Sequence, residues 1–375
     1  QPVRISRLEL TDFRNYEHIA VEFQPGINVL VGPNGQGKTN VVEAVAYLAT
    51  FSSHRVANDT ALVRAGCDRA VIRSLVDQGE RTMGLDVQIN PGRANRLQVN
   101  RAPVRRTRDA LGIVRAVMFA PEDLGLVKGD PAARRRFLDQ LLVQTSPRFA
   151  SVMADYDKTI KQRNSLLRSS AKSSSSIERE TLHSTLDVWN DRLVQFGADI
   201  VAGRLALLDR IAQPTSEAYS QVASTRNDVA MAYTAARLPD LSDDIGQRMR
   251  ETLDAIRGEE LARGVTLLGP HRDDVELSLN ALPARGYASH GESWSLALAL
   301  RLASYEVLHD EQSGDPILIL DDVFAELDQQ RRERLAQAAV ESHGQVLITA
   351  AVSGDVPESL RGVRFSVDSG AIVQG

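Results

Sequence analysis

Residues 32–39, Gly-Pro-Asn-Gly-Gln-Gly-Lys-Thr, match the phosphate-loop pattern G-x-x-x-x-G-K-[ST] in full. A β-branched run at 27–31 precedes this loop, and a helical pattern follows it. In such a setting the backbone N–H groups cradle phosphate oxygens at the positive end of a helix. We expect Lys38 to reach the β- and γ-phosphates of a nucleoside triphosphate and Thr39 to ligate Mg²⁺. The residues expected to hold the nucleotide are Gly32, Pro33, Asn34, Gly35, Gln36, Gly37, Lys38, Thr39 and Asn40.

A second stretch, residues 317–322, reads Ile-Leu-Ile-Leu-Asp-Asp, which is typical of a buried strand that ends in two carboxylates. A strand that is apolar on both faces belongs in a covered parallel sheet, and such sheets bind ligands at the carboxyl ends of their strands. We expect Asp321 to hold Mg²⁺ through a water molecule, and Asp322 to orient and deprotonate the water that attacks the γ-phosphate. Taken alone, the two aspartates would as readily cap the turn after the strand.

The composition limits the class of protein. The chain has 375 residues, a formal net charge of −5 and a single cysteine, Cys67, which excludes an internal disulfide and a zinc site built from cysteines. It contains no apolar run of the ~18–20 residues that a membrane span requires, and its N-terminus shows no signal-peptide pattern. We therefore expect a cytoplasmic protein that is not associated with a membrane.

Alternating and β-branched segments predict strands at both ends of the chain. The expected strands are 3–10, 19–23 and 27–31, forming one N-terminal sheet, then 70–76, 85–89, 97–99, 113–119, 275–279, 316–320 and 345–350. Of these, 85–89 and 97–99 would pair as a hairpin arm. Helices are expected at 292–309 and 329–342. Because the phosphate loop and the aspartate pair must meet, the two ends of the chain must come together.

The middle of the chain reads as helical. Apolar residues at heptad spacing fill 149–167, with Arg163 in one apolar slot, and resume over 182–200 after a serine-rich stretch. Two such helices joined by a polar tip form a short antiparallel coiled-coil hairpin, with arms of about 30 Å. A third helix near 243–262 completes the lobe. We therefore expect an α/β protein, with an ATPase domain (1–120 plus 265–375) and an inserted all-helical lobe (121–264).

The charge is distributed unevenly. Between residues 93 and 136 the chain holds eleven basic and four acidic residues, although the whole chain is negative. A patch of this kind concentrates a polyanion locally. Solvated arginines in local ion pairs would give the same composition, so the pattern alone leaves both interpretations open.

Ser289-His290-Gly291-Glu292 stands at the start of the expected helix 292–309, where a hydroxyl and free N–H groups make a second anion site. A short loop and a strand then lead to the aspartate pair, and Asp328 follows. This order resembles the signature motif and D-loop of the ABC ATPase superfamily, with its head of mixed sheet and flanking helices. In that superfamily the signature serine touches the γ-phosphate held by the opposite subunit. The resemblance thus implies that Ser289, Gly291 and Asp328 act on a nucleotide bound by a second copy.

The chain further resembles the RecF family of bacterial recombination mediators. The phrases that carry this resemblance span most of the chain in the family's order: 10–16, 119–124, 128–139, 269–274 and 320–328. The family implies a slow, DNA-stimulated ATPase that dimerises on ATP, binds double-stranded and gapped DNA, and acts with RecR and RecO to load RecA. It implies a role in DNA replication, repair and the SOS response at the nucleoid. It places Arg14 near the nucleotide, and we expect Arg105, Arg106 and Arg108 to contact DNA.

Two departures from general ABC practice stand out. The run 349–351 reads Thr-Ala-Ala where a transporter ATPase has a switch histidine, and 120–123 reads Ala-Pro-Glu-Asp without a Q-loop glutamine. The motifs fit three other classes of protein less well. An SMC- or Rad50-like structural head would need a longer coiled coil, a transporter ATPase would not use the helical insertion, and a small-molecule kinase would lack the signature order.

Overall fold

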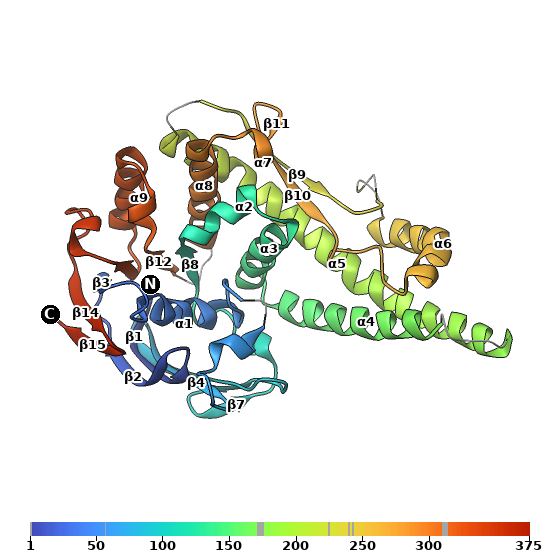
Figure 1. The fold of residues 1–375 in the computed structure, drawn as a ribbon, viewed down its shortest axis with the longest axis horizontal. Coiled ribbons are helices and arrows are strands. Elements are labelled where there is room, and N and C mark those ends of the chain that lie inside the picture. Colours follow the sequence, from blue (N-terminus) through green and yellow to red (C-terminus); the bar gives the residue numbers. More distant parts are fainter. Residues whose placement is uncertain are drawn as a thin grey trace.

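The computed structural model describes residues 2–56, 58–170, 176–223, 226–238, 241, 244–309 and 314–375, with the backbone alone described at 170 and 176–182. Figure 1 shows a head that contains both chain ends and a helical hairpin that projects from it. Of the serine-rich stretch 169–176, where the polar tip is expected, residues 171–175 lie outside the described residues, as does the side chain of Leu182.

A mostly parallel sheet forms the centre of the head and joins the two ends of the chain. Its order is β15-β14-β3-β13-β12-β8, and only β15 runs antiparallel to its neighbour. Every residue of β8, β12 and β13 is buried, as parallel strands covered on both faces require. The strand bounds are β3 Ile27–Val31, β8 Ala116–Phe119, β12 Ile317–Asp321, β13 Val346–Ala350, β14 Val363–Asp368 and β15 Ala371–Gln374.

A second, antiparallel sheet has the order β2-β1-β4-β5-β6-β7. Its strands are β1 Val3–Phe13, β2 Tyr16–Glu22, β4 Ala70–Gln78, β5 Arg81–Ile89, β6 Arg96–Val99 and β7 Ala102–Val104. The hairpin of β5 and β6 is confirmed. The expected single N-terminal sheet is wrong, because β3 leaves β1 and β2 and enters the parallel sheet between β13 and β14. The three middle residues of β3 are all buried, whereas β1 and β2 largely alternate.

Nine helices lie within the described residues, and the first of them separates the two large sheets. Val41, Val45 and Leu48 of α1 belong to one buried cluster with residues of both sheets. The bounds are α1 Lys38–Thr50, α2 Leu124–Lys128, α3 Pro131–Thr145, α4 Arg148–Ser170, α5 Ser176–Val222, α6 Ile245–Arg263, α7 Ala284–Tyr287, α8 His290–His309 and α9 Gln329–Glu341.

The helical lobe with its antiparallel hairpin of α4 and α5 is confirmed, and α6 packs against both helices. One strand, β9 (Val229–Thr234), also lies within the expected lobe and pairs with β10 (Asp274–Leu279), which in turn pairs with β11 (Leu282–Pro283). The second half of α5 packs along α8, so that one hydrophobic core continues from the lobe into the head. The domain boundaries at 121 and 264 stay a prediction.

The structure explains why a charged residue occupies an apolar slot of the hairpin. Arg163 is buried in α4, where it donates to Asn190 Oδ1 of α5 (2.9 Å), to Thr266 Oγ1 (2.9 Å) and to Glu260 of α6. One guanidinium therefore ties three segments of the lobe together. A rigid fork of donors suits this task because it satisfies several acceptors at fixed angles.

Replacing Arg163 with Met should destabilise the lobe by about 3–5 kcal/mol, because the buried carboxylate of Glu260 loses its cation. Urea unfolding followed by circular dichroism at the helical signal measures this loss. The double variant Arg163→Met, Glu260→Met should recover part of it. As a control, Arg250→Met removes the exposed ion pair with Asp191 and should change little. Equal losses for the two single variants would contradict the assignment.

Candidate functional site

The phosphate loop connects β3 to α1 in a conformation that requires its glycines. Gly35 and Gly37 have φ angles of 81° and 107°, in the left-handed region. A Cβ on Gly32 would collide with the Val367 carbonyl of β14, and one on Gly37 would collide with the Tyr16 hydroxyl. No side chain caps the N-terminus of α1. Its first N–H groups therefore point toward the loop and are free to bind an anion.

The turn between β1 and β2 is hydrogen-bonded to this loop and to the start of α1. Asn15 donates from Nδ2 to the Gln36 carbonyl (3.4 Å) and accepts from Asn40 Nδ2 (2.7 Å). On the other side of the loop, Gln36 Oε1 accepts a hydrogen bond from the Ser369 N–H in the turn after β14. The phosphate loop is thus held between the N-terminal and C-terminal strands of the chain.

Arg14, expected near the nucleotide, is fastened to α1. It donates from Nε and Nη2 to the two oxygens of Glu43 (2.9 and 2.7 Å), a carboxylate with no exposed surface. Burial acts to raise the pKa of Glu43, but the hydrogen bonds from Arg14 and Ser53 outweigh it and leave the pKa below its ordinary value. Glu43 is therefore a charged anchor for the β1–β2 turn, and a contact between Arg14 and the nucleotide stays a prediction.

The carboxylate of Asp321, at the end of β12, faces the start of α1. Its Oδ1 accepts hydrogen bonds from Thr39 Oγ1 (3.0 Å) and from Thr349 Oγ1 at the end of β13 (2.6 Å). Burial raises the pKa of Asp321 to about 6. A buried carboxylate beside a hydroxyl at the phosphate loop offers the oxygen ligands that Mg²⁺ prefers, so these residues fit that ion. Sequence reasoning had read Thr349 only as a missing histidine.

Asp322 lies beside the ammonium group of Lys38. Its Oδ2 is 4.0 Å from Lys38 Nζ, which also donates to the Pro33 carbonyl (3.2 Å). Asp322 has a left-handed φ of 48°, and its N–H donates to Thr349 Oγ1 (2.9 Å). Burial raises the pKa of Asp322, while Lys38 acts to lower it. Such backbone strain is common where a functional side chain must be aimed.

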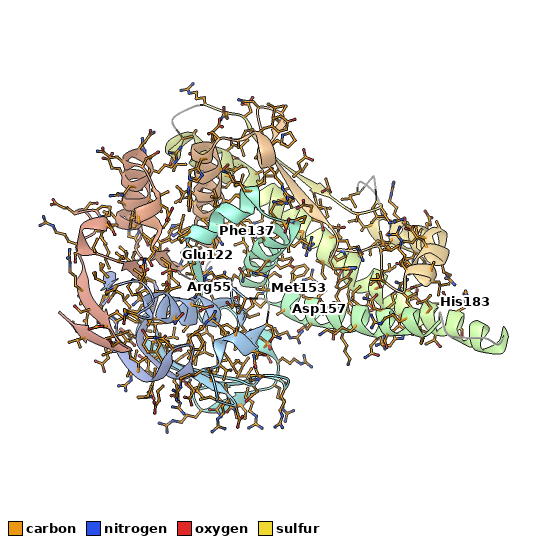
Figure 2. All side chains as sticks on the ribbon, in the orientation of Figure 1. Arg55, Glu122, Phe137, Met153, Asp157 and His183 are labelled. Carbon is orange, nitrogen blue, oxygen red and sulfur yellow. The ribbon has the colours of Figure 1, made fainter. Side chains whose placement is uncertain are left out.

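Two charged residues that sequence reasoning missed lie beside this centre. Glu122 follows β8, the neighbour of β12, and stands where a Q-loop glutamine was sought. Figure 2 shows it close to Arg55, whose Nε lies 3.8 Å from Glu122 Oε1. Arg55 Nη1 is also 3.5 Å from Glu43 and 3.4 Å from Asn40 Oδ1. The strand end beside β12 could have indicated Glu122, but no sequence pattern indicated Arg55.

Ser289 and Asp328 each cap the start of a helix. Ser289 is exposed at the start of α8, where its N–H donates to Glu292 and its Oγ accepts from the Glu292 N–H (3.2 Å), a reciprocal capping box. Asp328 caps α9 by accepting from the Arg331 N–H (3.0 Å). In Figure 1, α7, which leads into α8, is well separated from α1. Ser289 is thus exposed at the start of α8, and its role as a signature serine stays a prediction.

Part of the basic stretch is structural, so that both interpretations left open by the composition apply to different arginines. Arg115 is buried and donates to the Leu308 carbonyl. Arg134 is buried against Asp274, and Arg135 and Arg136 donate to backbone carbonyls. The residues that remain exposed or partly exposed near the antiparallel sheet are Arg93, Arg96, Arg101, Arg105, Arg106 and Arg108.

The strand register gathers most of these arginines at one end of the antiparallel sheet. Leu97 of β6 pairs with Val104 of β7, so that Arg96 and Arg105 extend the two strands at the same end. Arg69 precedes β4 at this end, since Ala70 pairs with Ile89. A hollow of about 510 Å³ lies here; besides the acidic Asp68, its lining includes three arginines: Arg69, Arg93 and Arg96.

Comparison with known proteins shows the family of this chain. Residues 4–369 match the family model described as RecF/RecN/SMC N terminal domain. The chain is 50% identical over 372 residues to the DNA replication and repair protein RecF of Streptomyces avermitilis, covering 99% of each, and 48% identical over 379 residues to that of Frankia alni, covering 99% of this chain and 100% of the relative. The chain belongs to the RecF family.

Two solved structures extend the comparison. The recombination mediator protein RecF-ATP in the RecFOR pathway superposes with a TM-score of 0.88 at 25% identity, covering 100% of this chain and 98% of that one. The Smc head domain with an extended coiled coil from Pyrococcus furiosus superposes with a TM-score of 0.54 at 16% identity, covering 99% and 96%. The second likeness shows a shared head fold.

Among the described residues, no helix is long and apolar enough to cross a membrane.

One RecF-family phrase, 269–274, lies at the base of the hairpin. His271 Nδ1 is 2.7 Å from the Tyr156 hydroxyl of α4, and Arg272 donates from Nε to the Thr266 carbonyl (2.7 Å). Burial lowers the pKa of His271 to about 4, so that the imidazole is neutral near pH 7. These contacts join the hairpin to the strand β10 that follows.

Replacing Lys38 with Ala should abolish nucleotide binding, because the buried ammonium is the charge that faces the loop's anion site. Fluorescence anisotropy of a labelled ATP analogue measures the affinity. Lys158→Ala, which removes an exposed lysine of α4, is the control and should bind normally. Retained affinity in the Lys38 variant would remove the phosphate-loop assignment.

Proposed function

We propose that this RecF-family chain is a recombination mediator in DNA repair that binds ATP with Mg²⁺ and thereby joins two copies of itself on double-stranded DNA. The observation that carries the proposal is the separation of two halves of an ATPase site within one chain. Lys38, Asp321 and Asp322 meet at the phosphate loop. Ser289 is exposed at the start of α8, and Figure 1 shows α7, which leads into α8, apart from α1. Asp328 caps α9. The solved RecF-ATP structure supports ATP as the nucleotide.

Each residue at the loop has a distinct task in this proposal. Thr39 and Asp321 hold Mg²⁺, which neutralises charge on the β- and γ-phosphates when bound. Lys38 binds the same phosphates. Asp322 orients the attacking water and accepts its proton, a role that its raised pKa favours. Arg55 and Glu122 adjust the charge at the edge of the site. Hydrolysis is slow and is stimulated by DNA.

A second copy completes the site. Its Ser289 hydroxyl and the N–H groups near Gly291 contact the γ-phosphate, and its Asp328 approaches the same nucleotide. ATP therefore acts as the link of a head-to-tail dimer, and hydrolysis releases it. Sedimentation of the protein with ATP and Mg²⁺, with and without gapped DNA, is the test of the whole proposal. A chain that remains monomeric in both conditions would overturn it.

The DNA surface in this proposal is the basic end of the antiparallel sheet, where Arg105 and Arg106 adjoin Arg69 and Arg96. Arginines on such a surface bind the duplex backbone through charge and carry little base specificity. Recognition of gap or junction ends, cooperation with RecR and RecO, and help in loading RecA follow from family membership. The RecFOR pathway named for the solved relative supports this part.

Ser289→Arg should leave ATP affinity unchanged and prevent the ATP-induced dimer, because the added side chain fills the space that the partner's γ-phosphate would occupy. Gel filtration with ATP and Mg²⁺ measures the dimer. Ser220→Arg, at an exposed position of α5, adds the same side chain elsewhere and should dimerise normally. A normal dimer of the Ser289 variant would refute the contact between subunits.

Replacing Arg105, Arg106 and Arg108 with Ala together should weaken duplex binding and flatten its salt dependence by about one unit of slope for each lost phosphate contact. Filter binding over a salt series measures both. The control removes Arg250, Arg257 and Arg263 of α6, which already pair with acidic residues, and should bind like the wild type. An unchanged slope in the first variant would make its arginines ordinary solvated surface.

A further inference from the structure

One arginine of the D-loop helix contacts the signature helix. Arg331, in the first turn of α9, is only 9% exposed. Its Nε donates to Ser295 Oγ of α8 (2.9 Å), and its Nη1 pairs with the Asp328 carboxylate. Its Nη2 lies 3.0 Å from the point where a Cβ would stand on Gly291. One guanidinium thus spans the start of α8 and the start of α9.

The positions it contacts lie on one face of α8. Gly291 and Ser295 are four residues apart, so that they stack on the same side of the helix. Ser295 has no exposed surface. Gly291 leaves room for the guanidinium, since any side chain there would press against Nη2. The planar fork of arginine holds its acceptors at fixed angles, which an ammonium group cannot do.

The contact also balances charge. The Asp328 side chain is about half exposed, and the proposed dimer brings it toward a triphosphate of the other copy. A free carboxylate in that place would repel the phosphates. Arg331 pairs with it and leaves the surface near neutral. Both effects concern residues that serve the partner's nucleotide, and neither touches the phosphate loop of the same chain.

We propose that Arg331 is a positioning residue that fixes Ser289, Gly291 and Asp328 as one rigid unit, so that the signature motif and the D-loop meet the partner's nucleotide together. This inference rests on the proposed ATP-dependent dimer. It means that a single buried side chain holds the starts of α8 and α9 in a fixed relative position. ATP binding by the isolated chain does not depend on it.

The first test compares Arg331→Met, Arg331→Lys and Ser295→Ala in sedimentation with ATP and Mg²⁺. Arg331→Met should bind ATP within about twofold of the wild type but weaken the dimer at least about tenfold, a loss of ~1.4 kcal/mol. Arg331→Lys should not rescue it, because charge without the fork is insufficient. Ser295→Ala should weaken the dimer less and should not add to Arg331→Met. Arg334→Met, at an exposed position of the same helix, is the matched control.

The second test separates positioning from general stability by mixing variants. Arg331→Met supplies an intact phosphate loop, whereas Lys38→Ala supplies intact signature and D-loop residues. Lys38→Ala alone should lack ATPase activity, and Arg331→Met alone should have much less than the wild type. The mixture should be more active than either, because one composite site of the mixed dimer is complete. A lesion that merely loosens the Arg331 variant would not be rescued by a partner.

The outcomes distinguish this inference from the proposed function. If the wild type does not dimerise with ATP, the proposed function itself fails. If the wild type dimerises, an equally tight Arg331→Met dimer would overturn the positioning role alone. An inactive mixture would overturn it as well. Should Arg331→Met unfold, Ser295→Ala in the same mixing assay decides the question, since it removes one hydroxyl only.

Discussion

The head depends on the hydrogen bonds that Asp321 accepts from Thr39 and Thr349. They join the start of α1 to the ends of β12 and β13, three segments that are far apart in the sequence. Parallel strands bring their carboxyl ends to one edge, and burial there would penalise an unpaired carboxylate. The two hydroxyls offset this penalty and hold the carboxylate of Asp321 beside the phosphate loop.

The sequence predicted the parts of this site that have local patterns. The phosphate loop, the strand before Asp321 and the hairpin of α4 and α5 each follow from spacing within a short window. The sequence did not predict Arg55, Glu122 and Thr349 as part of the site, because they are brought there by contacts between distant segments. The sheet to which β3 belongs was predicted wrongly for the same reason. Its pairing partners lie about 300 residues away in the sequence, so a short stretch of sequence around β3 does not indicate them. Arg163 was noticed as an anomaly, but only the lobe's three segments explain it.

The basic stretch shows how composition can mislead. Arg115 and Arg134 contribute to the count of positive charges, but both are buried and serve carbonyl or carboxylate acceptors. A count of charges in the sequence does not distinguish a buried, hydrogen-bonded arginine from one that is exposed to solvent. The strand register does separate them, because it brings Arg69, Arg96 and Arg105 to one end of a sheet although they lie in different segments of the chain.

The helix α5 runs over 47 residues, from the hairpin into the core beside α8. At ~1.5 Å per residue it is about 70 Å long. Because its second half, which contains Pro214, is packed against α8, the head and the hairpin share one long helix that acts as a rod. A tilt of about 5° at the head moves the far end of such a rod by about 6 Å, as simple leverage requires. A small change of tilt at the head therefore displaces the far end of α5 by several times as much as a point near the head.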